Sequence, residues 1–480
     1  MKRTLISETT NFVGQTVTVS GWVNVVRAHG KILFIDLRDR TGLLQVVFLP
    51  QETGIYEKVK NVRPEWVVSI TGDVVARPEK MVNEKIVTGK VELAAKNLEI
   101  LAEAKTVPFD IGTTGYEVNE EIRLKYRYLD LRRERLQKNI RARDAVISFF
   151  RGYMHRNNFV EIETPMLMKG TPEGSREYVV PSRLENGKFY ALPQSPQQFK
   201  QLSMVAGFER YFQIARCMRD EDLRGDRQPE FTQLDFEMSF VTQEEILQYT
   251  EAMFIELVKT LYPEKSFTEI PFPRMTYKQS MEKYGNDKPD IRKDKDNPNE
   301  LAFVWVLDFP MFEKDEEGNV QAAHHPFCLI NDEDKDKFMR GEDIFSIRAQ
   351  SYDLVLNGYE LSSGSIRIHE RDVQQKVFEI LNISKVDQER RFGHMLEAFT
   401  YGAPPHGGFA PGIDRVVMIL QNEPNIREVI AFPKTGEGRD LMMGSPDIIS
   451  AKQLKELGIG IAKETGKIVK TKKKKIIKTK

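Results

Sequence analysis

The sequence predicts an α+β protein in which a five-stranded OB barrel precedes a larger domain built on an antiparallel sheet flanked by helices. Three observations lead to this prediction: five strand-like segments within residues 14–101, two strand-like segments around a charged loop at residues 210–240, and helical patterns through the second half. At 480 residues the chain exceeds the usual size of one domain. We expect the barrel at 1–102, a linker at 103–132, the larger domain at 133–465 and a lysine-rich tail at 466–480.

The composition indicates a soluble protein. Lys+Arg and Asp+Glu are equal at 71 each. This neutral total does not by itself indicate a nucleic-acid-binding protein, but it can hide local basic patches. Two cysteines, Cys217 and Cys328, are too few for a disulfide framework, and Cys217 is expected to be a small buried residue. No stretch of about 20 apolar residues suggests a membrane span. The first ten residues contain no apolar run, which argues against a signal peptide and for a cytoplasmic protein.

The five barrel strands alternate apolar and polar residues. They are expected at Thr16–Val26, Ile32–Leu37, Leu43–Phe48, Trp66–Ala76 and Lys85–Ile100, the last interrupted near Gly89. A short helical segment at Ile55–Val62 follows the third strand, which is the order of an OB barrel that binds single-stranded oligonucleotides. An aromatic ring, arginines and polar side chains suit such a ligand. The candidate contacts are Arg27, Phe34, Gln45, Arg77 and Glu92, although Phe34 could equally belong to the core.

A charged loop lies between strands expected at Tyr211–Ala215 and Phe231–Phe240. Its charged residues are Arg219, Asp220, Glu221, Asp222, Arg224, Asp226 and Arg227. Guanidinium groups present two parallel donors, which suits phosphate, and Phe231 offers a ring for a base. The alternative is a solvated hairpin tip. We favour an anionic ligand because the loop also supplies carboxylates.

The same loop carries a family resemblance. Arg216, Arg219, Asp220, Glu221 and the run Arg227–Phe231 resemble motif 2 of the class II aminoacyl-tRNA synthetases, and RDEDLRGDRQPEFTQLD is similar to the bacterial aspartyl-tRNA synthetases. The helical stretch 119–158, with a break near 130–133, and the strand Phe159–Pro165 resemble motif 1. The strand and apolar helix within Gly407–Leu420 resemble motif 3. The resemblance covers roughly residues 1–447.

One region departs from these relatives. Bacterial aspartyl enzymes carry an inserted domain after a stretch similar to Lys288–Arg292, but here Leu301–Val306 follows almost at once. Residues 286–300 are therefore expected to be a remnant of that insert. Many relatives also have glycines at the positions of Ser362 and Ser363.

The resemblance implies an aspartate–tRNA ligase that uses ATP and Mg²⁺, charges tRNA-Asp and forms a homodimer through motif 1. It implies that the aspartate site contains Glu173, Ser195, Gln197, Lys200, Arg219, Asp235, His324 and Arg367. The ATP site would contain Arg219, Asp220, Glu221, Gln228, Phe231, Glu360, Gly412, Ile413, Asp414 and Arg415. Arg219, Arg415 and Glu360 would be catalytic, and Asp353 and Glu360 would hold Mg²⁺. The five barrel candidates fall at anticodon-contact positions.

The adjacent histidines His324 and His325 raise the question of a shared metal. They follow a strand-like segment, and neighbours on a strand point to opposite faces, so we do not expect one metal between them. The resemblance instead makes His324 a lid over aspartate.

Several alternatives remain open. An asparaginyl enzyme has the same fold, but a pocket for a neutral amide would not need two cations, Lys200 and Arg367. A second alternative is a non-catalytic RNA-binding paralogue. The acceptor could be tRNA-Asp alone or tRNA-Asn as well. The segment Lys467–Lys480, with eight lysines in fourteen residues, could be an inert tail or an arm for tRNA phosphates.

Overall fold

The chain forms two compact units. The computed structural model describes residues 2–170, 175–315 and 317–462, so Glu173 and the lysine-rich segment Lys467–Lys480 lie outside the described residues. One unit comprises Met1–Arg123 with Tyr128–Glu134, and the other comprises Leu124–Arg127 with Arg135–Lys480. Within the described ranges, every helix is too short or too polar to cross a membrane.

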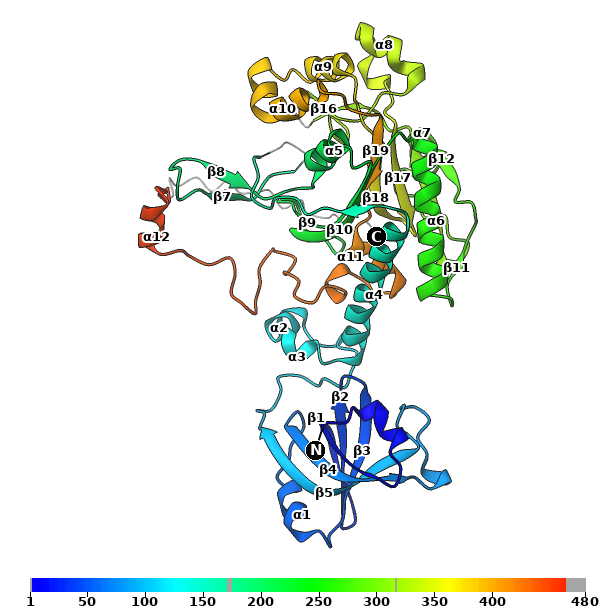
Figure 1. The fold of residues 1–480 in the computed structure, drawn as a ribbon, viewed down its shortest axis with the longest axis vertical. Helices are drawn as coiled ribbons and strands as arrows, with labels where there is room; N and C mark the ends of the chain where they lie inside the picture. The colour runs from blue at the N-terminus through cyan, green and yellow to red at the C-terminus, as the bar shows by residue number, and fades with distance from the viewer. Residues whose placement is uncertain (1, 171–174, 316, 463–480) are drawn as a thin grey trace, which may run out of the picture. The chain divides into compact units, whose positions relative to one another are not determined.

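The first unit is a closed five-stranded barrel, as predicted (Figure 1). Its strands are β1 (Thr16–His29), β2 (Ile32–Asp39), β3 (Gly42–Phe48), β4 (Val67–Ala76) and β5 (Val91–Ala102), joined in the order β1-β2-β3-β5-β4. Helix α1 (Thr53–Val59) follows β3. Alternate residues such as Val17, Val19 and Val23 point inward and are buried, which is the period-2 pattern of the sequence.

The fifth strand begins later than predicted. Residues 85–90 form turns, and β5 starts at Val91. The chain folds back on itself here, because the Asn83 amide donates to the Gly89 carbonyl. A Cβ at Gly89 would lie 1.7 Å from the Asn83 carbonyl oxygen, so this close approach requires glycine.

The second unit is built on an eight-stranded sheet (Figure 1). In spatial order its strands are β12 (Arg274–Thr276), β14 (Phe303–Leu307), β17 (Ser351–Leu356), β18 (Tyr359–Ile366), β19 (His406–Phe409), β10 (Glu230–Ser239), β9 (Arg210–Met218) and β6 (Val160–Glu161). The central neighbours are antiparallel, as predicted. The two edge pairs, β12 with β14 and β6 with β9, are parallel, so the prediction of an antiparallel sheet was wrong at the edges.

Smaller strand pairs surround this sheet. They are β7 (Val179–Pro181) with β8 (Phe189–Ala191), β11 (Ser266–Phe267) with β13 (Glu300–Leu301), and β15 (Phe312–Lys314) with β16 (Val320–Ala322). The first pair is the hairpin that frames the Asn186–Gly187 turn. The segment predicted as strand Phe159–Pro165 contributes only the two residues of β6.

Helices occupy the stretch predicted to be helical at 119–158 and the end of Gly407–Leu420, and others lie between and after them. They are α2 (Glu120–Lys125), α3 (Arg127–Asp130), α4 (Glu134–Arg156), α5 (Gln197–Val205), α6 (Gln243–Leu261), α7 (Tyr277–Tyr284), α8 (Lys335–Arg340), α9 (Arg371–Ile380), α10 (Lys385–Phe399), α11 (Ile413–Leu420) and α12 (Ala451–Glu456). A capping box explains the start of α6, because Thr242 accepts from the Glu245 amide while the Glu245 carboxylate accepts from the Thr242 amide.

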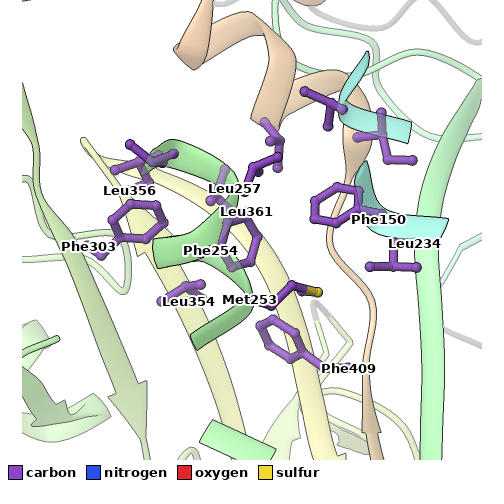
Figure 2. Close-up of a cluster of buried hydrophobic side chains, with 14 of the residues drawn as sticks. Phe150, Leu234, Met253, Phe254, Leu257, Phe303, Leu354, Leu356, Leu361 and Phe409 are labelled. Carbon is purple, nitrogen blue, oxygen red and sulfur yellow. The ribbon is translucent and has the colours of Figure 1, made fainter. Parts of the chain in front are cut away.

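The main core lies between α6 and the sheet. Figure 2 shows Phe254 and Leu257 of α6 beside Phe303 of β14, with Leu354 and Leu356 of β17 in the same cluster. Phe303 also stacks on Phe272 at 4.5 Å between ring centroids. Each such buried side chain stabilises the fold by about 1.5–3 kcal/mol. This packing makes the sheet a rigid platform for side chains on its other face.

A short connection replaces any inserted domain. Only residues 285–299 separate α7 from β13. The connection packs against the turn between β17 and β18, because a Cβ at Gly358 would lie 3.3 Å from the Asp290 Cβ. It therefore brings Asp287 and Lys288 to the edge of the cavity described next.

Candidate active site

A cavity of about 370 Å³ opens over the central strands of the second unit. It brings together residues from α5, β10, β17, β18 and α11 and from the loops between the elements. The predicted site residues that line it are Ser195, Gln197, Lys200, Arg219, Glu221, Gln228, Phe231, Asp235, His324, Asp353, Glu360, Arg367, Gly412, Asp414 and Arg415. The loop residues Asp226 and Arg227 line it as well, so the charged loop is not a solvated hairpin tip.

A cluster of four buried charges forms the floor of the cavity: three of them line it, and the fourth, Glu237, pairs with two of these without lining it. The Lys200 ammonium lies 3.0 Å from Asp235 Oδ2 and 3.3 Å from Glu237 Oε2. The Arg367 guanidinium donates through Nε and Nη2 to the two oxygens of Glu237, at 2.8 and 3.1 Å. All four side chains are at most 2% exposed. A fully buried, balanced cluster of this kind is costly to desolvate, which is typical of a site that binds a charged ligand.

The strand pattern explains how Asp235 and Glu237 come together. Phe231, Gln233, Asp235 and Glu237 alternate along β10 and therefore share one face. On the neighbouring strand β19, Gly408 lies opposite Glu237, and a Cβ there would lie 1.9 Å from Glu237 Oε2. Glycine at this position thus makes room for the buried carboxylate.

The two carboxylates of the floor have opposite pKa shifts. Burial raises the pKa of Asp235, although Lys200 opposes the shift. Burial also disfavours the Glu237 carboxylate, but Arg367 and Lys200 outweigh it and hold its pKa below the usual range. One oxygen of Asp235, Oδ1, is buried without a hydrogen-bond partner. An unpartnered buried acceptor is costly, and a cationic ligand would satisfy it.

The two histidines lie in a bend after β16, and both line the cavity. The argument from strand alternation does not apply to them, because the strand ends at Ala322. His325 Nε2 accepts from Arg367 Nη1 at 2.8 Å. Burial, followed by Arg367, lowers the pKa of His325 well below its usual value, and burial lowers that of His324. Among the described residues, no group of three metal-ligating side chains forms a metal cage.

Two arginines line the cavity beside the charged loop. The Arg219 guanidinium stacks over the Phe231 ring, with 5.1 Å between the guanidinium carbon and the ring centroid. Arg415 reaches from α11 to Asp226 in the charged loop at 3.1 Å, and its Nη1 donates to the Glu360 carbonyl at 2.6 Å. Both guanidinium groups therefore line the cavity together with an aromatic ring. This arrangement suits the phosphates and the base of a nucleotide.

Some residues that were predicted to bind the nucleotide make hydrogen bonds and ion pairs that stabilise the walls of the cavity. Gln228 exchanges two hydrogen bonds with the backbone of Lys434. Asp414 accepts from the Thr232 amide at 3.0 Å and pairs with Arg143 of α4. Two others are not among the residues that line the cavity: Ile413 packs in the main core, and Asp220 pairs with Arg176 at 3.5 Å near the surface.

A pair of carboxylates, Asp353 of β17 and Glu360 of β18, also lines the cavity. Burial and the charge of Glu360 raise the pKa of Asp353 well above its usual value. Burial disfavours the Glu360 carboxylate too, but Arg415 and Lys288 lower its pKa. Two neighbouring carboxylates whose mutual repulsion a divalent cation would relieve fit Mg²⁺, which accepts one or two carboxylates together with substrate phosphates. The predicted ligands therefore fit the ion.

The ionisable residues that the predicted site set missed include Asp226, Glu237, Lys288 and His325. The period-2 pattern of β10 could have identified Glu237 from Asp235. Lys288 lies 3.0 Å from Glu360 across a loop, and no local pattern signals this contact.

The five barrel candidates lie on one face of the first unit. Gln45 links Arg27 to Glu92, with contacts of 3.4 and 2.8 Å, and Glu92 lies 3.6 Å from Arg77. Phe34 pairs with Arg27 across the β1–β2 ladder and is not part of the barrel core. The structure thus forms a polar surface around one partly exposed ring.

Comparisons with known proteins agree with this geometry. The family described as "tRNA synthetases class II (D, K and N)" matches residues 119–436, and an "OB-fold nucleic acid binding domain" matches residues 17–101. The aspartate–tRNA(Asp/Asn) ligase of Rubrobacter xylanophilus is 43% identical over 94% of this chain and 95% of its own. That of Dictyoglomus turgidum is 42% identical over 94% and 96%. The aligned length of 573 residues in the first case exceeds the 480 residues of this chain, so that relative has segments without a counterpart here.

Solved structures show the same fold. The asparaginyl-tRNA synthetase of Pyrococcus horikoshii with asparaginyl-adenylate has a TM-score of 0.73 at 20% identity, covering 91% of this chain and 98% of its own. The aspartyl-tRNA synthetase of Entamoeba histolytica has a TM-score of 0.71 at 24% identity, covering 90% and 91%. With the family match over most of the second unit and relatives above 40% identity, the chain belongs to the class II tRNA synthetases, in the family of the aspartate–tRNA(Asp/Asn) ligases.

Proposed function

We propose that the protein activates L-aspartate with ATP and transfers it to the 3′ end of tRNA-Asp, with tRNA-Asn as a second acceptor. The observation that carries the amino-acid part is the buried cluster of Lys200, Asp235, Glu237 and Arg367, with Asp235 Oδ1 left unpartnered. The names of the relatives support both acceptors.

The cluster supplies groups for each charged part of aspartate. Asp235 Oδ1 accepts from the substrate ammonium. Lys200 and Arg367 each keep an N–H beyond those given to Asp235, Glu237, His325 and Ser365, and these donate to the side-chain carboxylate. Ser195 and Gln197 at the start of α5 border the same space.

Selection against asparagine rests on hydrogen-bond polarity. Both cations are already balanced by Asp235 and Glu237, so an unpaired charge does not decide the substrate, contrary to the argument from the sequence. Lys200 and Arg367 are donors only, and an amide NH₂ in place of a carboxylate oxygen would face them donor to donor.

Adenylate formation needs no side-chain nucleophile. The α-carboxylate of aspartate attacks the α-phosphorus in line, the bond to the bridging oxygen breaks and pyrophosphate leaves. Arg219 donates to the α-phosphate and the attacking carboxylate, Arg415 turns from Asp226 to the γ-phosphate, and Phe231 stacks on adenine. Catalysis is then positioning and charge stabilisation. The tRNA ribose hydroxyl next attacks the activated carbonyl and releases AMP.

Mg²⁺ would be held by Asp353 and Glu360, and it would neutralise phosphate charge. The protein's own part is to orient the carboxylates of Asp353 and Glu360 toward the position of the ATP phosphates. Lys288 balances Glu360 before ATP arrives.

The amino-acid selectivity of activation gives the test of the proposed function. In ATP–pyrophosphate exchange without tRNA, we expect aspartate to be preferred over asparagine by about 10³-fold or more in kcat/KM, because a site built for hydrogen bonds rejects a mismatched group strongly. Equal rates, or exchange with asparagine alone, would contradict the assignment of the floor. No exchange with either amino acid would favour a non-catalytic RNA-binding paralogue.

The barrel face is proposed to bind the anticodon. Replacing Phe34 by alanine should raise the KM for tRNA by about 10- to 100-fold, since loss of base stacking costs about 1–3 kcal/mol. Exchange without tRNA should stay at the wild-type rate, and this serves as the internal control. Equal loss of both activities would mean that the ring stabilises the barrel rather than binding tRNA.

A homodimer through the motif 1 region is also proposed. The edge strand β6 leaves Val160 44% exposed, and an edge with an exposed apolar residue suits pairing with a second copy of the chain. The two catalytic sites would then belong to one assembly.

A further inference from the structure

One hydroxyl contacts both a member of the carboxylate pair, Asp353, and a histidine that lines the cavity. Ser363 on β18 lies directly opposite Asp353 on β17, so both side chains project from the same face. Ser363 Oγ donates to Asp353 Oδ1 at 2.6 Å. The same oxygen lies 3.1 Å from His324 Nδ1. All three residues line the cavity.

The donor and the acceptor of each of these two hydrogen bonds can be assigned. A serine hydroxyl has one proton, and here Ser363 donates it to Asp353 Oδ1. The hydroxyl oxygen therefore accepts from His324, which requires a proton on Nδ1. In the neutral ring this leaves Nε2 as an acceptor.

The other side of the histidine is fixed by packing. The Phe309 ring meets the His324 ring edge to face, with 4.7 Å between centroids. Phe309 is itself buried with Val304, Val306 and Val355. The imidazole is therefore held between a rigid apolar cluster and one hydroxyl, and Ser363 determines which nitrogen carries the proton.

We propose that Ser363 is a positioning residue that joins the metal end of the cavity to its amino-acid end. It orients the Asp353 carboxylate and, through the same oxygen, holds His324 in the Nδ1–H form over the aspartate site. This inference rests on the proposed aspartate site. Groups next to metal ligands commonly change metal affinity by about 10–100-fold when removed.

The amino-acid end is tested by a double-mutant cycle. Aspartate binding is measured by calorimetry, without ATP or tRNA, for wild type, Ser363→Ala, His324→Ala and the double variant. We expect Ser363→Ala to weaken binding by about tenfold in the wild type and by less than about twofold when His324 is absent, since the hydroxyl acts through the ring. Additive losses would overturn the link. Ser362→Ala is the matched control, because its hydroxyl accepts from the Ala410 amide instead.

The metal end is tested with Mn²⁺ alone, by electron paramagnetic resonance titration. Ser363→Ala should weaken Mn²⁺ binding by about tenfold and Ser362→Ala should not. Unchanged affinity in Ser363→Ala would overturn the role at Asp353.

A substrate-free readout separates this inference from the proposed function. Nitrogen-15 spectra of histidine-labelled protein should show His324 protonated at Nδ1 in wild type and Ser362→Ala, and at Nε2 in Ser363→Ala. If wild type bears the Nδ1 proton but binds no aspartate, the proposed function fails while the serine link stands. If the tautomer does not depend on Ser363, the link fails whatever the substrate.

Discussion

Replacing Lys200 by methionine is expected to abolish aspartate activation, with a fall of about 10³-fold in kcat/KM for aspartate. The ammonium is 2% exposed and holds Asp235 and Glu237 in place, so its loss removes a substrate contact and leaves two buried carboxylates without one of their cations. ATP–pyrophosphate exchange across a range of aspartate concentrations measures the effect.

The same change should lower stability, by about 3–5 kcal/mol, because one partner of a buried ion cluster is removed. Thermal unfolding followed by circular dichroism separates this loss from the catalytic one. Lys200→Arg retains a cation for the two carboxylates but moves its donors, so it should fold and still lose at least about tenfold in activity. Lys278→Met, at an exposed lysine of α7, is the matched control. Wild-type-like exchange in folded Lys200→Met would remove the basis for the aspartate assignment.

Replacing Arg219 by alanine is expected to slow adenylate formation by about 10²–10³-fold, mainly through kcat. Its guanidinium lies over Phe231 and faces the cavity, where charge develops on the α-phosphate. Its contacts with the fold are modest: a stacked ring and a 3.4 Å hydrogen bond to the Gln194 carbonyl. Stability should therefore change by less than about 1 kcal/mol.

Single-turnover adenylate formation is the measurement for Arg219→Ala, with unfolding temperature recorded alongside. Arg340→Ala removes an exposed arginine of α8 that pairs with Glu342 and should behave as wild type in both assays. A loss confined to the KM for ATP, with kcat unchanged, would mean that Arg219 binds the ground state and the transition state equally.

Local patterns in the sequence predicted most of the secondary structure. The alternation of Val17, Val19 and Val23 predicted a barrel strand, and β1 is that strand. The pattern failed where long-range contacts compete with it. Residues 85–90 carry strand-like apolar positions, but the return of the chain to Asn83 turns them into a loop. The direction of the edge strands β6 and β12 also depends on partners distant in the chain.

The sequence by itself determined the family, the two folds and most of the residues that line the cavity, because motif spacing and strand alternation are local properties. Only the tertiary structure decided how the charges are balanced. It brought Glu237 beside both Lys200 and Arg367. It also paired Lys288 with Glu360 and placed both histidines in the lining of one cavity. It also joined Asp353 to His324 through Ser363. Burial and pairing of ionic groups depend on contacts between segments far apart in the chain, and no local pattern encodes them.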